Sequence, residues 1–275
     1  MIIHPIAKIN LGLNVIGKRS DGYHNLETVF YPIEIRDTLQ VNEMEEGFPS
    51  SVDCDLKVTN ADLECDEQSN LVVKAYKQLS KMYPMPKVFA HLHKVIPSQA
   101  GLGGGSSDGA FMIRALAEML RLPITETEMI FHASKLGADC PFFIKAKPVY
   151  ATGIGEKMTP IELSLKGYHL IVVRPNVAIS TAQAFSLIEP KPTRKTCREI
   201  VLQPIETWRD ELTNDFEQSA FSFYPEIRDI KELLYKGGAV YASMSGSGSS
   251  VYGIFDTKVD LSKWFKGMFY TQIDL

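Results

Sequence analysis

The sequence contains few cysteines, and their spacing is irregular. Four occur in 275 residues, at positions 54, 65, 140 and 197, and no two of them form a Cys-x-x-Cys arrangement. Such spacing fits neither a structural zinc site nor a dense disulfide framework. We therefore expect free thiols in a reducing compartment.

Long apolar runs and an excess of basic residues are also missing. No stretch approaches the roughly 18 apolar residues of a membrane helix, and the first residues do not resemble a signal peptide. We expect a cytoplasmic protein with no membrane partner. The 29 Lys and Arg against 33 Asp and Glu give a net charge of −4, which argues against a non-specific nucleic-acid binder. A site for a polyanionic ligand must then be built locally.

Apolar and polar residues alternate strictly from Ala7 to Val15, which predicts a half-buried strand. Its polar face carries Lys8, Asn10 and Asn14. Other segments with strand-like patterns or composition are 29–35, 38–41, 88–96, 169–173 and 251–255. Helical spacing and capping residues mark 70–82, 106–120, 125–136, 181–188 and 226–235. Ser69 or Asn70 can cap the first of these helices, and Thr125 and Glu128 form a capping box on the third. These elements mix without a regular βαβ alternation, so we predict an α+β fold.

A glycine-dense loop lies between a predicted strand and a predicted helix. Glycine residues let backbone N–H groups approach an anion closely, and a helix N-terminus adds the positive end of a dipole. The loop lacks the P-loop pattern and does not match a dinucleotide fingerprint. We predict that it binds a phosphate group, with the serine hydroxyls at its end available to phosphate or Mg²⁺. Its residues are Pro97, Ser98, Gln99, Ala100, Gly101, Leu102, Gly103, Gly104, Gly105, Ser106 and Ser107.

Asp139 lies just after a predicted helix, among small and apolar residues. A carboxylate there is poorly solvated, and Lys8 is a natural partner for it. Phosphoryl transfer needs a group that orients and deprotonates the acceptor hydroxyl, and an aspartate beside a lysine has that capacity. An ordinary loop aspartate in an Asx turn fits the same sequence equally well.

Two further loops contain residues suited to binding. The turn 21–24 carries Tyr23 and His24, and such side chains hold a heteroaromatic base by stacking and edge hydrogen bonds, although a surface turn is the commoner outcome. The serine- and glycine-rich segment 243–250 permits close backbone approach, either to a ligand or to another loop. His91 and His93 share a strand face, but no third ligand stands near them in sequence, so we interpret them as structural.

Together these segments resemble the GHMP kinases, a family that includes galactokinase, homoserine kinase, mevalonate kinase and phosphomevalonate kinase. The loop 97–107 looks like the family's second motif, and 243–250 looks like its third. The segments 7–11, 19–24 and 137–143 narrow the resemblance to a branch in isoprenoid precursor synthesis, which phosphorylates the 2-hydroxyl of a cytidine diphosphate ester of methylerythritol. One departure is Gly109, where the family's pattern has alanine.

The resemblance implies a two-domain architecture and a set of residue roles. The N-terminal domain, residues 1–155, would be like the second domain of ribosomal protein S5, and residues 156–275 would form a ferredoxin-like domain. Lys8 and Asp139 would be the catalytic pair, the loop 97–107 would bind ATP, and Ser106 or Ser107 would contact Mg²⁺. The small-molecule cytidyl diphosphate substrate would be bound by Asn10, Tyr23, His24, Phe30 and Phe185.

Other functions stay open on the sequence. A GHMP kinase with a homoserine or mevalonate acceptor is the first alternative, although those substrates offer no base to stack on Tyr23. A catalytically silent nucleotide-binding protein on the same fold is the second, and the presence of both Lys8 and Asp139 speaks against it. An RNA-binding module is the third, and the deficit of basic residues disfavours it. We expect a monomer or a homodimer that binds no nucleic acid.

Overall fold

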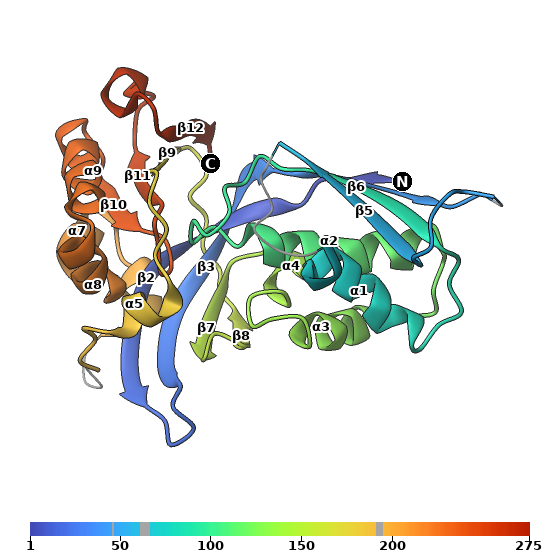
Figure 1. The fold of residues 1–275 in the computed structure, drawn as a ribbon. Coiled ribbons are helices and arrows are strands. Elements are labelled where there is room, and N and C mark those ends of the chain that lie inside the picture. The colour runs from blue at the N-terminus through green and yellow to red at the C-terminus, as the bar shows by residue number, and fades with distance from the viewer. Residues whose placement is uncertain (46, 61–66, 191–194) are drawn as a thin grey trace. The chain divides into compact units, whose positions relative to one another are not determined.

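The chain folds into two compact units, each assembled from separate segments of the sequence (Figure 1). The first unit consists of Met1–Ala7, Ile35–Ile96 and Gly103–Lys147, and the second of Lys8–Glu34, Pro97–Leu102 and Pro148–Leu275. The structure is a computed structural model that describes residues 1–45, 47–60, 67–190 and 195–275. Residues 97–107, the glycine-dense loop, are therefore divided between the two units.

A four-stranded sheet and its helices form the first unit. The strands lie in the order β1-β4-β6-β5, with β5 parallel to β6 and the other pairs antiparallel. The helices pack together, α2 in contact with α1, α3 and α4, and they cover one face of the sheet (Figure 1). The bounds are β1 Ile2–Ile3, β4 Thr38–Glu43, β5 Cys54–Thr59, η1 Glu67–Ser69, α1 Leu71–Ser80, β6 Val88–His93, α2 Gly104–Met119, α3 Glu126–Ser134 and α4 Phe142–Lys145.

Local capping fixes where the helices of the first unit begin. The Asn70 side chain accepts a hydrogen bond from the Val72 amide at the start of α1. Thr125 and Glu128 form a complete capping box on α3, as the sequence predicts. Helix α2 begins two residues before the predicted start because glycine tolerates a helical backbone as well as a loop. A Cβ on Gly109 would lie 2.9 Å from the Leu71 Cβ, so close packing of α1 on α2 explains this glycine.

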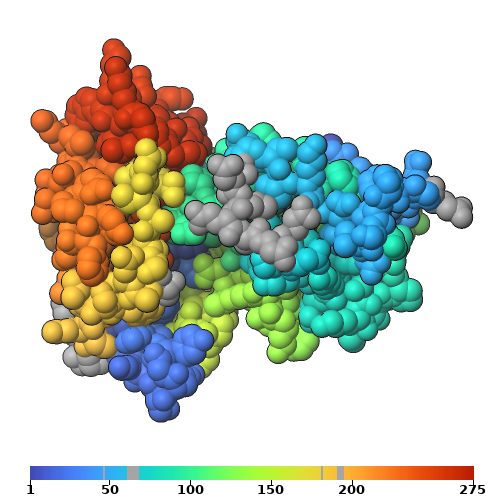
Figure 2. Space-filling view, in the orientation of Figure 1, coloured from blue at the N-terminus to red at the C-terminus, as the bar shows by residue number. Residues whose placement is uncertain are grey.

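Two antiparallel sheets form the second unit, in the orders β2-β3-β7-β8 and β10-β11-β9-β12. The segments from β9 to β12, yellow to red in Figure 2, pack into one continuous body. The strands are β2 Ile6–Lys18, β3 His24–Arg36, β7 Val149–Gly153, β8 Lys157–Pro160, β9 His169–Arg174, β10 Tyr241–Met244, β11 Val251–Phe255 and β12 Phe269–Asp274. The helices are α5 Thr181–Phe185, α6 Cys197–Val201, η2 Ile205–Thr207, α7 Trp208–Glu211, α8 Phe216–Phe223, α9 Pro225–Lys236 and η3 Ser262–Phe265.

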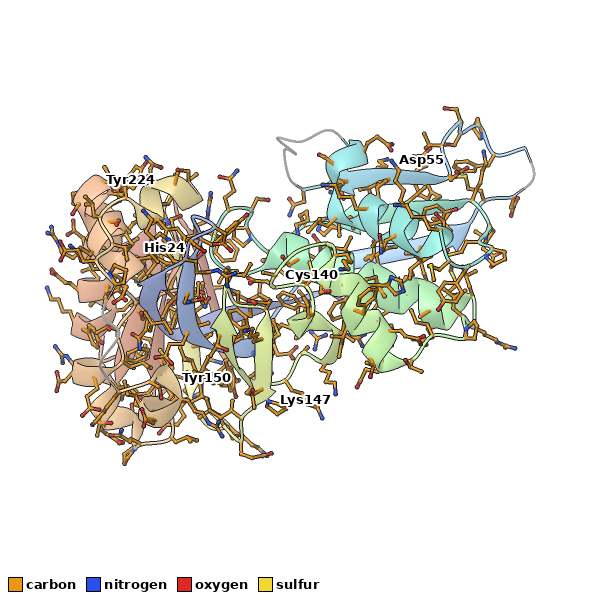
Figure 3. The ribbon with its side chains drawn as sticks, turned by 90° about the horizontal axis from the view of Figure 1, so that it is seen from below. His24, Asp55, Cys140, Lys147, Tyr150 and Tyr224 are labelled. Carbon is orange, nitrogen blue, oxygen red and sulfur yellow. The ribbon has the colours of Figure 1, made fainter. Side chains whose placement is uncertain are left out.

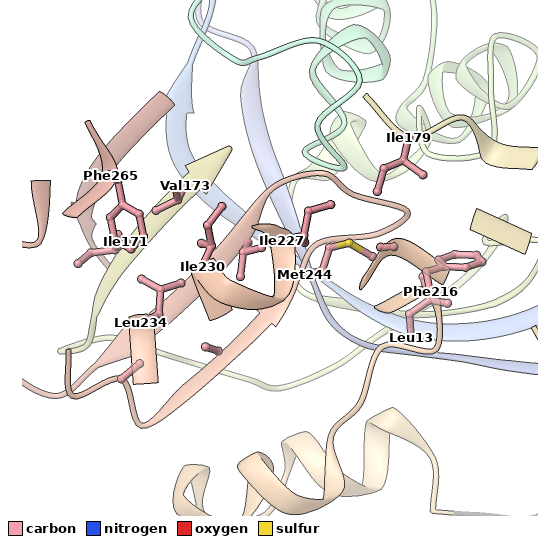
Figure 4. Packing of buried hydrophobic residues seen from close by; sticks show 14 of the residues in the cluster. Leu13, Ile171, Val173, Ile179, Phe216, Ile227, Ile230, Leu234, Met244 and Phe265 are labelled. Atoms are coloured by element: carbon pink, nitrogen blue, oxygen red, sulfur yellow. The ribbon is translucent and has the colours of Figure 1, made fainter. Parts of the chain in front are cut away.

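The core of the second unit lies between α8, α9 and the strands β9, β10 and β11 (Figure 4). Ile227, Ile230 and Leu234 follow each other at helical spacing on α9 and are fully buried. They pack with Ile171 and Val173 of β9. The helices thus cover one face of the sheet. Strand β11 begins directly after the small-residue loop 243–250.

Strand β2 is buried on both faces, so the prediction of a half-buried strand is wrong. The apolar residues Ile9 and Leu11 are fully buried, and Lys8 and Asn10 on the other face are only 3% and 2% exposed. Alternation reports the chemical character of the two faces, but not what the rest of the chain lays over them. A lysine placed at such a position needs polar partners there.

Several other expectations from the sequence can be compared directly with the structure. The helix expected over 181–188 ends at Phe185, and the strand expected over 88–96 ends at His93. Cys54, Cys140 and Cys197 are buried thiols, whereas Cys65 lies outside the described residues. The predicted domain boundary after residue 155 falls inside the second compact unit, and it stays a prediction about the family's domains. Among the described residues, no helix is long and apolar enough to cross a membrane.

Candidate active site

Lys8 is held on β2 by partners within the second unit. Its ammonium donates hydrogen bonds to the Asn10 Oδ1 and, at 2.9 Å, to the Gly101 carbonyl oxygen. It also lies 5.1 Å from the centre of the Phe30 ring, a cation–π distance. The Asn10 Nδ2 donates to the Thr28 hydroxyl at 2.9 Å, and that hydroxyl donates to the Gly12 carbonyl at 2.5 Å. These contacts order the amide so that its oxygen faces the lysine.

The first half of the glycine loop packs on the small-residue loop 243–250 of the same unit. The Ser245 hydroxyl donates to the Gly101 carbonyl at 2.8 Å, and the Ser250 amide donates to the Ala100 carbonyl at 3.2 Å. Gly101 has a φ of +73°, and a Cβ there would lie 1.9 Å from the Ser245 carbonyl oxygen. Of the two alternatives left open for loop 243–250, the structure therefore shows packing against another loop.

The second half of the loop starts helix α2 in the first unit. Gly103 is the N-cap with a φ of 73°, and no side chain caps the helix among the described residues. A Cβ on Gly104 would meet Ile96 Cγ2 at 2.9 Å, but nothing described lies within 4 Å of one on Gly105. The four glycines thus have different roles. Gly101 and Gly104 fit against protein, Gly103 takes the left-handed N-cap conformation, and Gly105 leaves the uncapped amides of α2 open to a ligand.

The two serines of this helix start differ in their surroundings. Ser106 hydrogen-bonds to Cys140, a residue labelled in Figure 3, and burial raises the pKa of that thiol to about 11 although this hydrogen bond opposes the rise. Ser107 is fully buried, and its hydroxyl has no hydrogen-bond partner within the described part of the chain. A buried hydroxyl without a partner is unusual and suits a ligand that supplies one.

Asp139 lies in the short turn between α3 and α4 of the first unit and is partly buried. The Phe142 amide donates to its backbone carbonyl at 3.2 Å, which starts the single turn of α4. Lys8 belongs to the second unit, so the pairing of the two residues stays a prediction. Within the described residues, no cluster of three His, Cys, Asp or Glu side chains could bind a metal.

A second buried lysine lies close to the glycine loop. Lys94 follows β6 and contacts two carboxylates, those of Asp37 and Asp108, the latter at 2.6 Å. Burial acts to lower the pKa of Lys94, but the two carboxylates outweigh it and raise that pKa. Burial also raises the pKa of Asp108 to about 7, against the opposing attraction of Lys94.

Aromatic residues gather at the start of β3 in the second unit. The rings of His24 and Phe185 stack with centroids 4.7 Å apart and planes 17° from parallel, and Phe185 contacts Phe216 edge to face. Tyr23 is 61% exposed, in a turn closed by the hydrogen bond from its amide to the Asp21 carboxylate. Figure 3 labels His24 on this strand. His24, rather than Tyr23, is thus the residue next to Phe185, and Phe30 is buried beside Lys8.

Thr28 and the charged group of Asp37, Lys94 and Asp108 do not stand out in the sequence, and Ser245 stands out only as part of the segment 243–250. Thr28 had a usable signal, because it lies two residues before Phe30 on one strand and therefore on the same face. The charged group had none, since its members are separated by 57 and 14 residues.

Two family models match the chain: "GHMP kinases N terminal domain" over residues 70–147 and "GHMP kinases C terminal" over residues 196–265. The chain belongs to the GHMP kinase family. This confirms the predicted family, and with it the mixed α and β architecture.

The similar proteins define a narrower group. The 4-diphosphocytidyl-2-C-methyl-D-erythritol kinase of Bacteroides fragilis is 47% identical over the full length of both chains. The protein of the same name from Porphyromonas gingivalis is 44% identical over 96% of this chain and 95% of its own. A crystal structure of 4-(cytidine 5'-diphospho)-2C-methyl-D-erythritol kinase has a TM-score of 0.78 and 29% identity, over 92% of this chain and 90% of that one.

A mevalonate kinase of Methanococcus jannaschii has the same fold. Its TM-score is 0.70, at 17% identity over 99% of this chain and 97% of that one. At this level of identity the likeness concerns the fold alone.

Proposed function

We propose that the chain transfers the γ-phosphate of ATP to the 2-hydroxyl of 4-(cytidine 5'-diphospho)-2-C-methyl-D-erythritol. The observation that carries the proposal is the 47% identity, over the full length, to a relative named as a kinase of this compound. The aromatic group at the start of β3 supports it independently, since stacking rings suit a cytosine base and serve no purpose for a homoserine or mevalonate acceptor.

The glycine loop is the proposed ATP site. The uncapped N-terminal amides of α2 and the open position at Gly105 suit the phosphates of ATP. This local arrangement would allow an anion to bind although the net charge of the chain is −4, because backbone dipoles attract an anion without any excess of basic residues. We place the nucleotide's phosphates at residues 103–107 and interpret Gly101 as a packing residue.

The donor set at the helix start fits Mg²⁺ in the role of a nucleotide-bound ion. Mg²⁺ in kinases is held by few protein ligands together with phosphate oxygens and water, and the partnerless Ser107 hydroxyl or that of Ser106 would supply the protein contact. The ion, when bound, neutralises charge on the phosphates.

Asp139 and Lys8 are the proposed catalytic pair. The Asp139 carboxylate would accept the proton of the 2-hydroxyl while that oxygen bonds to the γ-phosphorus, and the bond to the β-phosphate oxygen breaks to release ADP. Lys8, oriented by Asn10 and the Gly101 carbonyl, would stabilise the negative charge on the Asp139 carboxylate and on the phosphoryl group.

The cytidyl group is proposed to stack at Tyr23, His24 and Phe185. Because His24 and Phe185 are already in contact, the base must either stack beside them or separate them. The Tyr23 ring is 61% exposed and precedes His24 in the chain, so it would be available to stack on such a base. Asn10, whose amide is engaged by Lys8 and Thr28, would contribute by fixing the lysine beside the substrate.

An ADP-release assay with a panel of acceptor alcohols tests the function. The protein should phosphorylate the cytidyl compound and leave homoserine and mevalonate unchanged. Turnover of one of those two with none of the cytidyl compound would refute the proposal.

The variant Asp139→Asn tests the proposed catalytic base. It should bind ATP normally but lose activity, and retention of more than about a tenth of the wild-type rate would refute the role of Asp139 as base.

The variant Tyr23→Ala tests the proposed stacking site for the cytosine base. Stacking is worth about 1–3 kcal/mol per base, so the KM for the cytidyl substrate should rise while that for ATP stays constant. Equal changes in the two constants would place the base elsewhere. Phe223→Ala, a variant of another exposed ring in the second unit, is a matched control and should change neither constant.

A further inference from the structure

Asp37, Lys94 and Asp108 form a buried charged group in the first unit, which we name the ionic triad. The Asp37 carboxylate accepts hydrogen bonds from the Val95 amide at 2.5 Å and the Ile96 amide at 2.8 Å. The Lys94 ammonium donates to Asp37 and, at 2.6 Å, to Asp108. Nothing in the proposed reaction uses any of these three side chains.

The position of the triad in the sequence connects it with the glycine loop. Val95 and Ile96 directly precede the loop, and Asp108 directly follows it, in the helix α2 that begins at Gly104 within the loop. The Lys94 ammonium also lies against the start of α2, 3.4 Å from the place where a Cβ on Gly104 would stand. Asp37 therefore fixes the backbone on the entry side of the loop, and the Lys94–Asp108 contact fixes the helix on its exit side.

Stability alone does not account for Asp108. The triad buries two carboxylates with one ammonium, and all three side chains are at most 6% exposed. The Asp108 Oδ1 has no hydrogen-bond partner within the described part of the chain. An excess carboxylate with an unsatisfied oxygen costs free energy on burial, whereas Asp37 and Lys94 by themselves would form a balanced pair. A residue kept at such a cost points to a role other than folding.

We infer that the ionic triad is a clamp on the glycine loop and that Asp108 is a positioning residue for nucleotide binding. Asp108 draws the first turns of α2 toward Lys94 and so sets the direction in which the amides near Gly105 point. Hydrogen bonds from amides to phosphate depend steeply on distance and angle, so a small rotation of this turn weakens them. The inference rests on the proposed function, because it takes the glycine loop as the ATP site.

The test is the variant Asp108→Asn, which keeps the size of the side chain and removes its charge. We expect it to be at least as stable as the wild-type protein in thermal unfolding near pH 8. We expect a non-hydrolysable ATP analogue with Mg²⁺ to bind about tenfold more weakly in calorimetry, the change expected from one weakened charge-assisted hydrogen bond. The KM for ATP should rise, and the KM for the acceptor should stay constant. Glu118→Gln, the same charge change at an exposed position on α2, is the control and should alter none of these values.

Each result decides a separate question. Equal nucleotide affinity in the variant and the wild-type protein would overturn the clamp. A lower unfolding temperature, or failure to fold, would also overturn it, because the carboxylate would then be retained for stability. A wild-type protein that binds no nucleotide would overturn the assignment of the glycine loop itself, and the acceptor assay would show separately whether the proposed function fails with it.

Discussion

Two buried lysines, one in each unit, are held by different kinds of partner. Lys94 in the first unit contacts the carboxylates of Asp37 and Asp108, which neutralise its charge. Lys8 in the second unit donates to an amide oxygen and a backbone carbonyl and lies over the Phe30 ring. These dipolar groups orient the ammonium and carry no net charge of their own. Lys94 is thus bound to two carboxylates of its own unit, whereas Lys8 donates hydrogen bonds to two neutral oxygens of the second unit.

Replacing each lysine by methionine should affect different properties: mainly stability at Lys94, and mainly the catalytic rate at Lys8. Lys94→Met leaves two buried carboxylates facing each other without a cation, which should cost about 3–5 kcal/mol of unfolding free energy. Lys8→Met removes the hydrogen bonds to the Asn10 and Gly101 oxygens and should cost about 1–2 kcal/mol. It should nevertheless lower kcat by at least about 100-fold, in line with the loss of a group that stabilises transition-state charge.

Chemical denaturation and steady-state kinetics on both variants measure these effects. A Lys94→Arg variant is a control that retains the positive charge and should recover much of the stability. The comparison would be wrong if Lys8→Met were the less stable protein, or if it kept most of its activity.

Two glycines of the loop, one in each unit, also differ in their surroundings: Gly101 is packed against protein, and Gly105 is open. Gly101→Ala forces a left-handed backbone on alanine and drives its Cβ against the Ser245 carbonyl, so we expect a loss of about 2–3 kcal/mol in stability. Gly105→Ala places a methyl group in open space on a helix and should gain about 0.5–1 kcal/mol. The methyl group should also hinder phosphate approach and raise the KM for ATP.

Thermal unfolding and ATP kinetics separate the two glycine variants. A stabilised Gly105→Ala protein with an unchanged KM for ATP would show that the phosphates bind away from this position. A Gly101→Ala protein as stable as the wild type would show that the contact with loop 243–250 is not required.

Sequence patterns predicted what local interactions decide. The capping box of Thr125 and Glu128 forms as predicted, and Asn70 is the one of the two predicted candidates, Ser69 and Asn70, that caps α1. Such caps are predictable because they involve residues within three positions of each other. Strand β11 has the predicted bounds, since its apolar run is short and bounded by turn residues. Residue periodicity alone predicts only a mixture of strands and helices. The resemblance of the motifs to the GHMP kinases is what identifies the fold.

Contacts between distant segments could not be predicted in this way. The polar face of β2 reads as solvent-exposed, but Gly101 and Ser245 cover Lys8 and Asn10 from positions far along the chain. The four loop glycines look equivalent in sequence, and only their neighbours distinguish the packed Gly101 from the open Gly105. Neighbours in space, rather than residue type, assign these roles.

Thr28→Val tests whether dipolar partners position Lys8. The substitution keeps the shape of the side chain and removes the hydroxyl that accepts from Asn10 and donates to Gly12. Asn10 then loses the contact that orients its amide, and we expect about 1 kcal/mol of lost transition-state stabilisation, seen as a several-fold lower kcat. Thr28→Ser should restore the rate because it keeps the hydroxyl. Equal rates for the valine variant and the wild-type protein would show that the orientation of Lys8 does not depend on this chain of hydrogen bonds.

The smallest predicted effect concerns an exposed charge, against which the buried groups can be judged. Glu128 accepts hydrogen bonds from the Thr125 amide and hydroxyl, and these lower the pKa of its carboxyl. A carboxyl with a lowered pKa in the folded state contributes stability above its ordinary pKa, and that contribution is lost as the pH falls through the folded-state value. Glu128→Gln keeps a capping side chain, so its unfolding temperature should be slightly below that of the wild-type protein near pH 7 and equal to it near pH 3. A gap of the same size at both pH values would show that shape, rather than charge, makes the glutamate the better cap.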